Sequence, residues 1–386
     1  MPAPPISSRR DFLGAAGAWG ASMMAGLASA DSVPLAPPDK QPVDVAIPEK
    51  PEKTVGWAIV GLGKLALEEI LPAFGRSRLS RVTALVSGHP DKAKKVADVY
   101  GVPESGIYNY ETYDRLADNP DVDAIYIVLP NSMHAEYTIR GFQAKKHVLC
   151  EKPMAANVAE CEAMIAAGRE AERKLMIAYR LRYEPFNKKV IELCRSEELG
   201  PIQSFSASNC QVVEAPNIRL SGELAGGPLG DIGVYCLNAA RYCLDAEPIE
   251  VSAFAHQPET DPRFREVPAA VSFAMKFPGG VLATCDCSFN ASESRRYRVQ
   301  CQKGFIDLEN AFSYEGQILT VASDKRRAQL QIAPVDHFAA EMDHFSECIL
   351  GGNEPRTPGE EGLKDMKVMA AIETAAKSGR VERVCS

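Results

Sequence analysis

Small residues at a fixed spacing follow the first apolar run of the chain, and they constrain its fold more than any other feature. Gly61, Gly63 and Ala66 form the pattern G-x-G-x-x-A directly after the strand-like run Val55–Val60 and open an amphipathic helical pattern. The first glycine permits a tight turn, the second lets a ligand approach the backbone, and the alanine lets the helix pack against the strand. A helix that begins there presents free N–H groups and a positive end to a diphosphate. The candidate cofactor-binding residues of this loop are Gly61, Leu62, Gly63, Lys64 and Leu65.

Short apolar runs alternate with helical patterns over residues 55–178. The expected buried strands are Val55–Val60, Val82–Val86, Ala124–Leu129 and His147–Leu149, followed by a helix-to-strand unit over Val158–Ile177. This alternation predicts a parallel sheet with helices on both faces, the doubly wound Rossmann fold. We therefore expect residues 55–178 to form a dinucleotide-binding domain.

The pattern changes after Gly200 to longer strand-like runs separated by turn signals. These runs are Gln203–Ser208, Glu250–Ala255, Ala270–Phe277, Val281–Phe289 and Arg296–Gln300. They predict an open, mostly antiparallel sheet, with a helix that begins near Asp231 packed on one face. Helical patterns return after Asp336. Residues 179–386 are thus expected to form a substrate and oligomerisation domain, whose last helices can return to the first domain.

The first fifty residues carry signals of a different kind. An arginine pair, Arg9-Arg10, precedes the small and apolar run Gly14–Leu27, which ends in the cleavage pattern Ala28-Ser29-Ala30. This order predicts a twin-arginine signal peptide over residues 1–30 and export of the folded protein to the periplasm. The proline-rich segment 31–54 is expected to form an extended arm, either a disordered tether or a segment that lies across a neighbouring subunit.

Charge and residue counts exclude several classes of function. The net charge of −8 and the scattered Lys and Arg residues give no basic surface for nucleic acid. No interior run is long enough for a membrane span, so we expect no membrane partner after export. Eleven cysteines, an odd number without C-x-x-C spacing, are expected to be mostly buried free thiols. His337 and His344 lie seven apart on an expected helix and are interpreted as ordinary helix histidines, so no metal is predicted.

The end of the second expected strand selects between the two common nicotinamide dinucleotides. An acidic side chain there accepts hydrogen bonds from the ribose of NAD, whereas the extra phosphate of NADP needs donors. Here Val86 is followed by Ser87, Gly88 and, within the next helix, Lys92, with no acid at the strand tip. Because the Lys92 ammonium can face a phosphate dianion, the sequence favours NADP. A solvated loop lysine is the alternative.

Polar residues follow the expected strands Ala124–Leu129 and His147–Leu149, at the carboxyl edge where open α/β sheets bind ligands. Lys152 precedes Pro153 in a turn, not on a helix surface, and this geometry places its ammonium beside the nicotinamide. Ser132 and Met133 are expected to line the same cleft. The candidate cofactor-binding residues at this edge are Leu129, Pro130, Asn131, His134, Glu151 and Lys152.

Asp231 and Tyr235 lie four residues apart at the start of the expected helix, which places both side chains on one helix face. A phenol is a poor proton carrier because it ionises only near pH 10. A nearby ammonium favours the phenolate, and Lys152 could supply that charge. A half-buried helix tyrosine is the alternative for Tyr235.

With these motifs, the chain resembles the glucose–fructose oxidoreductase family and its aldose–aldose relatives, within the Gfo/Idh/MocA group of sugar and inositol dehydrogenases. The likeness rests on E-K-P around Lys152, D-x-G-x-Y from Asp231 to Tyr235, the S-G-x-x-x-K segment, the leader and the arm. It implies that Lys152 and Tyr235 are catalytic and flank the nicotinamide, with Asp231 as their acidic neighbour.

Further positions follow from the same resemblance. It implies that Tyr179 and Arg219 contact the substrate, together with Lys152, Asp231 and Tyr235, and that Arg180 contacts the cofactor. The chain departs from the family at Ile218, where a tryptophan is expected. The identity of the acceptor sugar therefore stays open.

The resemblance also implies a mechanism in which NADP is tightly bound and does not dissociate, because free NADP is not expected outside the cytoplasm. Tyr235 would remove the proton of an aldose anomeric hydroxyl while C1 passes hydride to NADP, which gives a lactone. A second sugar, an aldose or a ketose, would then accept the hydride in a ping-pong scheme and become an alditol. We expect these sugars as the small-molecule partners, and a homo-oligomer, either a dimer or a tetramer.

Two alternatives remain at this point. The chain could be an ordinary NAD(P)-dependent sugar dehydrogenase with a dissociable cofactor, or a non-catalytic exported sugar-binding protein. The joint presence of Lys152, Asp231 and Tyr235 favours catalysis, because binding alone does not require these three residues.

Overall fold

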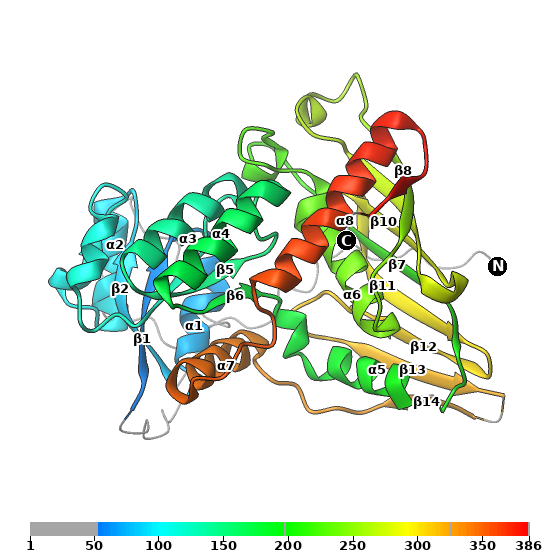
Figure 1. The fold of residues 1–386 in the computed structure, drawn as a ribbon, viewed down its shortest axis with the longest axis horizontal. Helices are drawn as coiled ribbons and strands as arrows, with labels where there is room; N and C mark the ends of the chain where they lie inside the picture. The colour runs from blue at the N-terminus through cyan, green and yellow to red at the C-terminus, as the bar shows by residue number, and fades with distance from the viewer. Residues whose placement is uncertain (1–52, 197, 325, 385–386) are drawn as a thin grey trace, which may run out of the picture. The chain divides into compact units, whose positions relative to one another are not determined.

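The computed structural model describes residues 53–196, 198–324 and 326–384 (Figure 1). The predicted signal peptide, residues 1–30, and the arm up to residue 52 lie outside the described residues. None of the described helices is both long enough and apolar enough to cross a membrane.

The first sheet has six parallel strands in the order β3-β2-β1-β4-β5-β6. They are β1 (Val55–Val60), β2 (Ser80–Val86), β3 (Ile107–Tyr108), β4 (Ala124–Ile127), β5 (His147–Glu151) and β6 (Leu175–Ala178). The strand order reverses between β1 and β4, and a crevice for ligands forms at the carboxyl ends of such neighbours. The predicted doubly wound sheet is therefore confirmed.

Helices pack on this sheet through apolar side chains. Trp57 of β1 is fully buried, and its ring contacts Phe74, Tyr126 and Phe345. The helices of this region are α1 (Leu71–Phe74), α2 (Pro90–Tyr100), α3 (His134–Gln143) and α4 (Val158–Ala171). A π-helical turn over Ala66–Ile70 leads into α1.

A helix from the C-terminal part of the chain, α7 (His337–Gly351), packs against this first sheet. Its Ser346 hydroxyl accepts a hydrogen bond from the Trp57 indole at 3.3 Å. Its Asp343 carboxylate accepts hydrogen bonds from the Ser77 hydroxyl at 2.6 Å and from the backbone N–H groups of Arg78 and Leu79. Because these donors precede β2, α7 fixes the chain that enters the strand next to β1.

The second sheet has nine strands in the order β14-β13-β12-β11-β7-β10-β9-β8-β15. All its pairs are antiparallel except β7 with β10, so the predicted mostly antiparallel sheet is confirmed. Its central strands are β7 (Ile202–Val212), β10 (Leu282–Ser288), β9 (Ala270–Lys276), β8 (Glu250–His256) and β11 (Asn290–Cys301). The sequence analysis did not identify β12 (Gly304–Glu309), β13 (Ile318–Ser323), β14 (Arg326–Leu330) and β15 (Glu382–Arg383).

Helices cover one face of this second sheet (Figure 1). They are α5 (Pro185–Ser196), α6 (Val234–Leu244) and α8 (Gly359–Ser378). Cys285 and Cys287 of β10 point to this covered side, where both are buried next to Cys236 of α6. The ten cysteines among the described residues are all free thiols.

A buried charge network fastens α6 to α8. The Arg241 guanidinium of α6 contacts the Asp365 carboxylate of α8, and both side chains are almost fully buried. Asn238 donates a further hydrogen bond to Asp365 at 2.8 Å. Because α6 begins at the candidate site, this network holds one wall of that site against the rest of the fold.

Candidate functional site

A cavity of about 920 Å³ lies at the carboxyl ends of β1, β2, β4 and β5, and the start of α6 forms its opposite wall. It is the place where the reversed strand order of a doubly wound sheet predicts a ligand. The predicted residues that line it are Gly61, Leu62, Gly63, Lys64, Leu65, Ser87, Gly88, Lys92, Leu129, Pro130, Asn131, His134, Glu151, Lys152, Arg180, Arg219, Asp231 and Tyr235.

The glycine-rich loop has the shape that a dinucleotide requires. Gly61 has a φ of +93°, and a Cβ there would lie 2.2 Å from the Val128 carbonyl oxygen, so no other residue fits. A Cβ at Gly63 would meet nothing within 4 Å, although Gly63 lines the cavity. Packing therefore demands glycine at position 61, whereas position 63 leaves open space next to a helix N-terminus. That space is what the close approach of a diphosphate needs, and the loop fits a dinucleotide.

The tip of β2 carries hydroxyl and ammonium groups in place of an acid. The buried Ser87 hydroxyl accepts a hydrogen bond from the His89 N–H at 3.1 Å, and Gly88 and Lys92 line the same end of the cavity. Lys92 lies in the first turn of α2. A helix N-terminus and an ammonium at this position favour an added phosphate on the ribose.

His134 joins the loops that follow β4 and β5. It is fully buried, and its two ring nitrogens lie 2.8 Å from the Pro153 carbonyl oxygen and 2.9 Å from that of Leu129. Burial lowers the pKa of His134, which the carbonyl contacts oppose. The ring thus holds the turn that carries Lys152 next to the loop after β4.

Asn131 links the first domain to the loop before α6. Its side-chain amide donates to the Ala225 carbonyl oxygen at 2.8 Å, and the Ser132 N–H donates to Leu224 in the same segment. This loop also carries Arg219, so both walls of the cavity are connected by hydrogen bonds.

Lys152, Asp231 and Arg219 form a charged cluster on one side of the cavity. The Lys152 ammonium donates to the Asp231 carbonyl oxygen at 2.8 Å and lies 3.6 Å from its carboxylate, while Arg219 donates to that carboxylate at 2.7 Å. Burial would raise the pKa of Asp231, but the Lys152 and Arg219 cations outweigh it and lower this pKa. Asp231 is therefore an ionised anchor for both cations.

Tyr235 lies next to two cations. Its ring centroid is 4.5 Å from the Lys152 ammonium nitrogen and 5.1 Å from the Arg180 guanidinium carbon. Its ring also packs against Phe312, with centroids 5.8 Å apart. The half-buried Tyr235 side chain thus lines the cavity next to two cations, a position from which its hydroxyl can exchange a proton with a bound ligand.

The structure does not bring Tyr179 into the cavity, which corrects the expectation that it contacts substrate. Its side chain is buried next to Asp365, in the network that joins α6 to α8. The direction of the chain explains the difference, because consecutive residues leaving β6 point to opposite sides. Arg180 faces the cavity, and Tyr179 therefore faces away from it.

The cavity also contains residues that the sequence analysis did not single out. Several come from β7, from β11 and from the segment after β12, far from the motifs in sequence. Aromatic residues in loops were the only available signal, and spacing does not assign them to a site. These additional lining residues include Gln211, Glu214, Arg295, Phe312, Tyr314 and Phe338.

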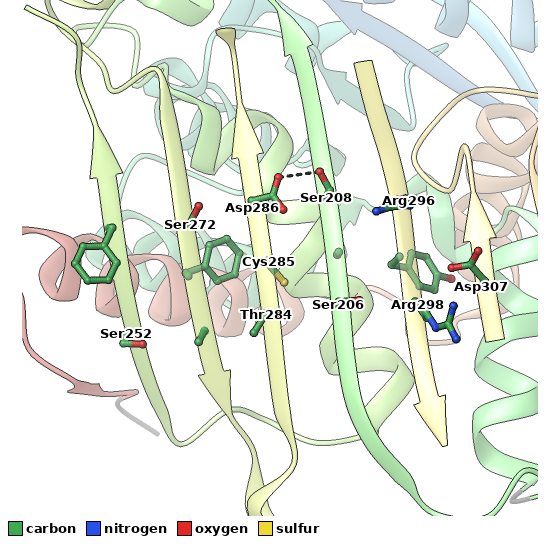
Figure 2. A pocket seen from close by; sticks show the side chains of 15 residues that line it. Ser206, Ser208, Ser252, Ser272, Thr284, Cys285, Asp286, Arg296, Arg298 and Asp307 are labelled. Carbon is green, nitrogen blue, oxygen red and sulfur yellow. Dashed lines mark hydrogen bonds between the residues drawn. The ribbon is translucent and has the colours of Figure 1, made fainter. Parts of the chain in front are cut away.

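A second cavity, of about 570 Å³, lies on the face of the nine-stranded sheet opposite to α6 and α8 (Figure 2). Serine side chains, Thr284, and the charged Asp286, Arg296, Arg298 and Asp307 line it. The Ser208 hydroxyl donates to Asp286 at 2.8 Å. The open sheet face lacks the helix N-terminus and glycine loop of the first cavity, so the first cavity is the candidate active site.

Neither His337 nor His344 lies in a group of metal ligands. The His337 ring contacts the Tyr314 carbonyl oxygen at 3.2 Å, and the His344 ring accepts a hydrogen bond from the Arg356 N–H at 3.0 Å. Within residues 53–196, 198–324 and 326–384, no group of three or more His, Cys, Asp or Glu side chains could hold a metal ion.

Comparison with known proteins agrees with this geometry. Residues 55–179 match the family model described as "Oxidoreductase family, NAD-binding Rossmann fold", and residues 187–307 match the "GFO/IDH/MocA C-terminal domain". A D-xylose 1-dehydrogenase [NADP(+)] from Haloarcula marismortui is 31% identical, over 86% of this chain and 94% of that protein.

Solved structures show the same fold over a similar length. The structure of an aldose-aldose oxidoreductase from Caulobacter crescentus complexed with glycerol has a TM-score of 0.84 and 44% identity, and the match covers 86% of this chain and all (100%) of that one. A 3-ketoreductase from Actinomadura kijaniata in complex with NADP and TDP-benzene has a TM-score of 0.76 and 27% identity, covering 84% of this chain and 98% of that one.

Proposed function

The chain is a sugar oxidoreductase of the Gfo/Idh/MocA family, and we propose that it keeps NADP bound while it passes hydride from an aldose to a second sugar. The observation that carries this proposal is the position of Tyr235 next to the Lys152 and Arg180 cations, in a cavity that continues into the glycine loop. The aldose-aldose oxidoreductase from Caulobacter crescentus, 44% identical, supports sugars as both donor and acceptor.

NADP is the proposed cofactor. The cavity offers the open space at Gly63, the helix end after it, and Ser87 and Lys92 at the tip of β2. The relatives whose names include NADP(+) or whose structures contain NADP support the same choice. When bound, NADP would supply the acceptor and donor of hydride. Its nicotinamide would lie next to Lys152 and Tyr235, at the carboxyl end of β5.

The chain's own residues would handle the proton. Tyr235 would take the proton from the anomeric hydroxyl of the first sugar and return it to the carbonyl oxygen of the second. Lys152 would donate a hydrogen bond to the same oxygen and polarise it, held in place by Asp231. Because the proton leaves one sugar and enters the other, the complete exchange releases no proton.

The cofactor prediction can be tested by dialysing the purified protein thoroughly and recording its near-ultraviolet absorbance. Addition of an aldose should produce a reduced-nicotinamide band, and a suitable second sugar should remove it. An aldonolactone, which has no hydride to give, should leave the oxidised protein unchanged. A protein that is empty after dialysis, and that turns over one sugar only with added NADP, would instead be a dehydrogenase with a dissociable cofactor.

We also propose the periplasm as the place of action, on the basis of the arginine pair and apolar run in residues 1–30. Export in the folded state would carry the loaded cofactor across the membrane. A protein that keeps its cofactor through many turnovers suits a compartment without a supply of free NADP.

The proposal includes a homo-oligomer, with a second copy packed on the uncovered face of the nine-stranded sheet (Figure 2). Small side chains leave this face accessible. Arg298 of β11 lies opposite Asp307 of β12, while Ser208 of β7 separates Arg296 from Asp286 of β10. A twofold axis through the sheet would place basic strands of one copy against acidic strands of the other. Thr284, on this face, offers a position at which to test it.

Thr284→Arg is expected to reduce the mass measured by sedimentation equilibrium to that of a single chain, because it places a bulky charge in the middle of the face. Asn353→Arg, on an exposed loop, is the matched control and should keep the oligomer. An oligomer that survives Thr284→Arg would exclude this face as the interface.

A further inference from the structure

Arg180 is a buried cation with an unusual set of neighbours. It occupies a turn over Arg180–Arg182, directly after β6, and is 5% exposed. Its guanidinium donates to the carbonyl oxygens of Phe312 at 2.6 Å and of Ser313 at 3.4 Å. Among the residues that the structure describes, no carboxylate forms an ion pair with it. Carbonyl dipoles therefore satisfy its hydrogen bonds but do not neutralise its charge.

The two acidic groups near Arg180, Glu151 and Glu341, are both buried. Burial raises the pKa of each carboxyl group, although Arg180 acts against the rise in both, and Glu151 also accepts hydrogen bonds from the Tyr126 hydroxyl and the Lys152 N–H. Glu341 is fully buried, and neither of its oxygens has a hydrogen-bond partner in the described part of the chain. A carboxyl group in that position is more stable protonated than ionised.

Aromatic groups complete the surroundings of the guanidinium. The ring centroids of Tyr314, Tyr235 and Phe338 lie 4.7, 5.1 and 5.9 Å from its central carbon. Burial acts against the charge of Arg180, but Tyr235 and Tyr314 outweigh it and raise its pKa, so the guanidinium stays charged.

The two cations next to Tyr235 are not equivalent. Lys152 and Arg219 share the Asp231 carboxylate, so the negative charge of Asp231 partly neutralises the Lys152 ammonium. Arg180 forms no such ion pair with a carboxylate in the described part of the chain. The titratable and charged groups that face Arg180 or Tyr235 are Lys152, Arg219, Tyr126, Tyr314, Glu151, Glu341 and His337. Burial, followed by Arg180, lowers the pKa of His337 to about 3, so this ring is neutral.

We propose that Arg180 is a positioning residue that, together with Lys152, holds Tyr235 ready to accept a proton. The inference rests on the proposed function, in which Tyr235 carries the proton of the sugar. The buried charge of Arg180 stabilises the phenolate, because a buried cation within about 6 Å interacts with an anion more strongly than a solvated cation does. Lys152 contacts the reacting oxygen, and Arg180 acts on the same phenol from the β6 side.

The test compares Arg180→Met and Arg180→Lys through the pH dependence of the first half-reaction, the appearance of reduced nicotinamide after an aldose is mixed with loaded enzyme. Arg180→Met is expected to move the midpoint of the pH–rate profile up by about one to three units, because an opposite charge at this distance shifts ionisation by that amount. At pH values below the midpoint of this variant, its rate should be about tenfold or more lower than the wild-type rate. At higher pH the two rates should become similar. Arg180→Lys keeps the charge and should keep most of the wild-type midpoint.

Arg182→Met is the matched control in the same turn. The Arg182 guanidinium stacks on Tyr242, with 3.3 Å between its carbon and the ring centroid, and does not face Tyr235. This variant should keep the wild-type midpoint. An Arg180→Met profile that is lower at every pH, with an unchanged midpoint, would show that Arg180 only supports the fold and would overturn the proposal.

A second measurement covers the case in which Arg180→Met does not fold. In the wild-type protein, the tyrosinate absorbance that Tyr235→Phe removes should titrate with the same midpoint as the rate. Arg180→Gln, which removes the charge but keeps hydrogen-bond donors, should move both midpoints up by the same amount. Separate movement of the two curves would overturn the role of Arg180. The proposed function fails by a different result, namely wild-type enzyme that shows no reduced nicotinamide with any aldose.

Discussion

Tyr235→Phe is expected to lose about 10²- to 10⁴-fold in turnover between two sugars, while it keeps its bound NADP. The phenyl ring can still pack against Phe312 and lie beside Lys152 and Arg180, so the cavity should keep its shape. Only the group that carries the proton is removed. The measurement is steady-state turnover with a donor and an acceptor sugar, alongside the near-ultraviolet spectrum of the dialysed variant.

Tyr242→Phe provides the control for this prediction, because it removes a phenol from the same helix on a different side. The Tyr242 hydroxyl donates to Glu361 at 3.1 Å, at the contact between α6 and α8. This variant should turn over at close to the wild-type rate. Wild-type turnover by Tyr235→Phe would remove Tyr235 from the mechanism, even if the cofactor and sugars were identified correctly.

Asp365→Ala is expected to lower the free energy of unfolding by about 3–5 kcal/mol, because it leaves the buried Arg241 cation without its buried partner. Asn238 would lose the acceptor of its hydrogen bond as well. Urea unfolding followed by circular dichroism would measure the change. Since this network fastens α6, loss of activity should accompany partial unfolding and should not occur before it.

Glu360→Ala is the matched control on the same helix. Glu360 forms an ion pair with Arg169 at 2.7 Å, but both side chains are largely exposed to solvent. Exposed pairs contribute little, so this variant should lose less than about 1 kcal/mol. Equal losses from Asp365→Ala and Glu360→Ala would contradict a special role for the buried pair.

Much of the architecture could be predicted because local spacing encodes it. The G-x-G-x-x-A loop, the strand-like runs of residues 55–178 and the four-residue spacing of Asp231 and Tyr235 each describe a geometry within one or two elements. Ligands bind at the carboxyl ends of parallel strands, and this rule was enough to predict that Lys152 lies close to the glycine loop. No long-range contact had to be known. The short strands β12 to β14 were not predicted, because the alternation of apolar and polar residues in each covers few positions and the turn signals around them are weak.

Other features depend on contacts between residues far apart in sequence. Arg219 and Asp231 meet only because the loop after β7 folds back on α6. Tyr179 and Arg180 are neighbours in sequence, yet one joins the α6 and α8 network and the other faces Tyr235. The approach of α7, with Glu341 and His337, follows from the packing of Phe345 on Trp57 across the first sheet.

The sequence by itself determined the two sheets, the dinucleotide loop and the residues that can carry a proton, because periodicity and motif spacing act over a few residues. Only the tertiary structure decided which charges are compensated. Asp231 is shared by two cations, whereas Arg180 is buried among carbonyl groups and aromatic rings. The strength of a charge depends on burial and on partners brought from distant segments, and neither quantity is written in the spacing of residues along the chain.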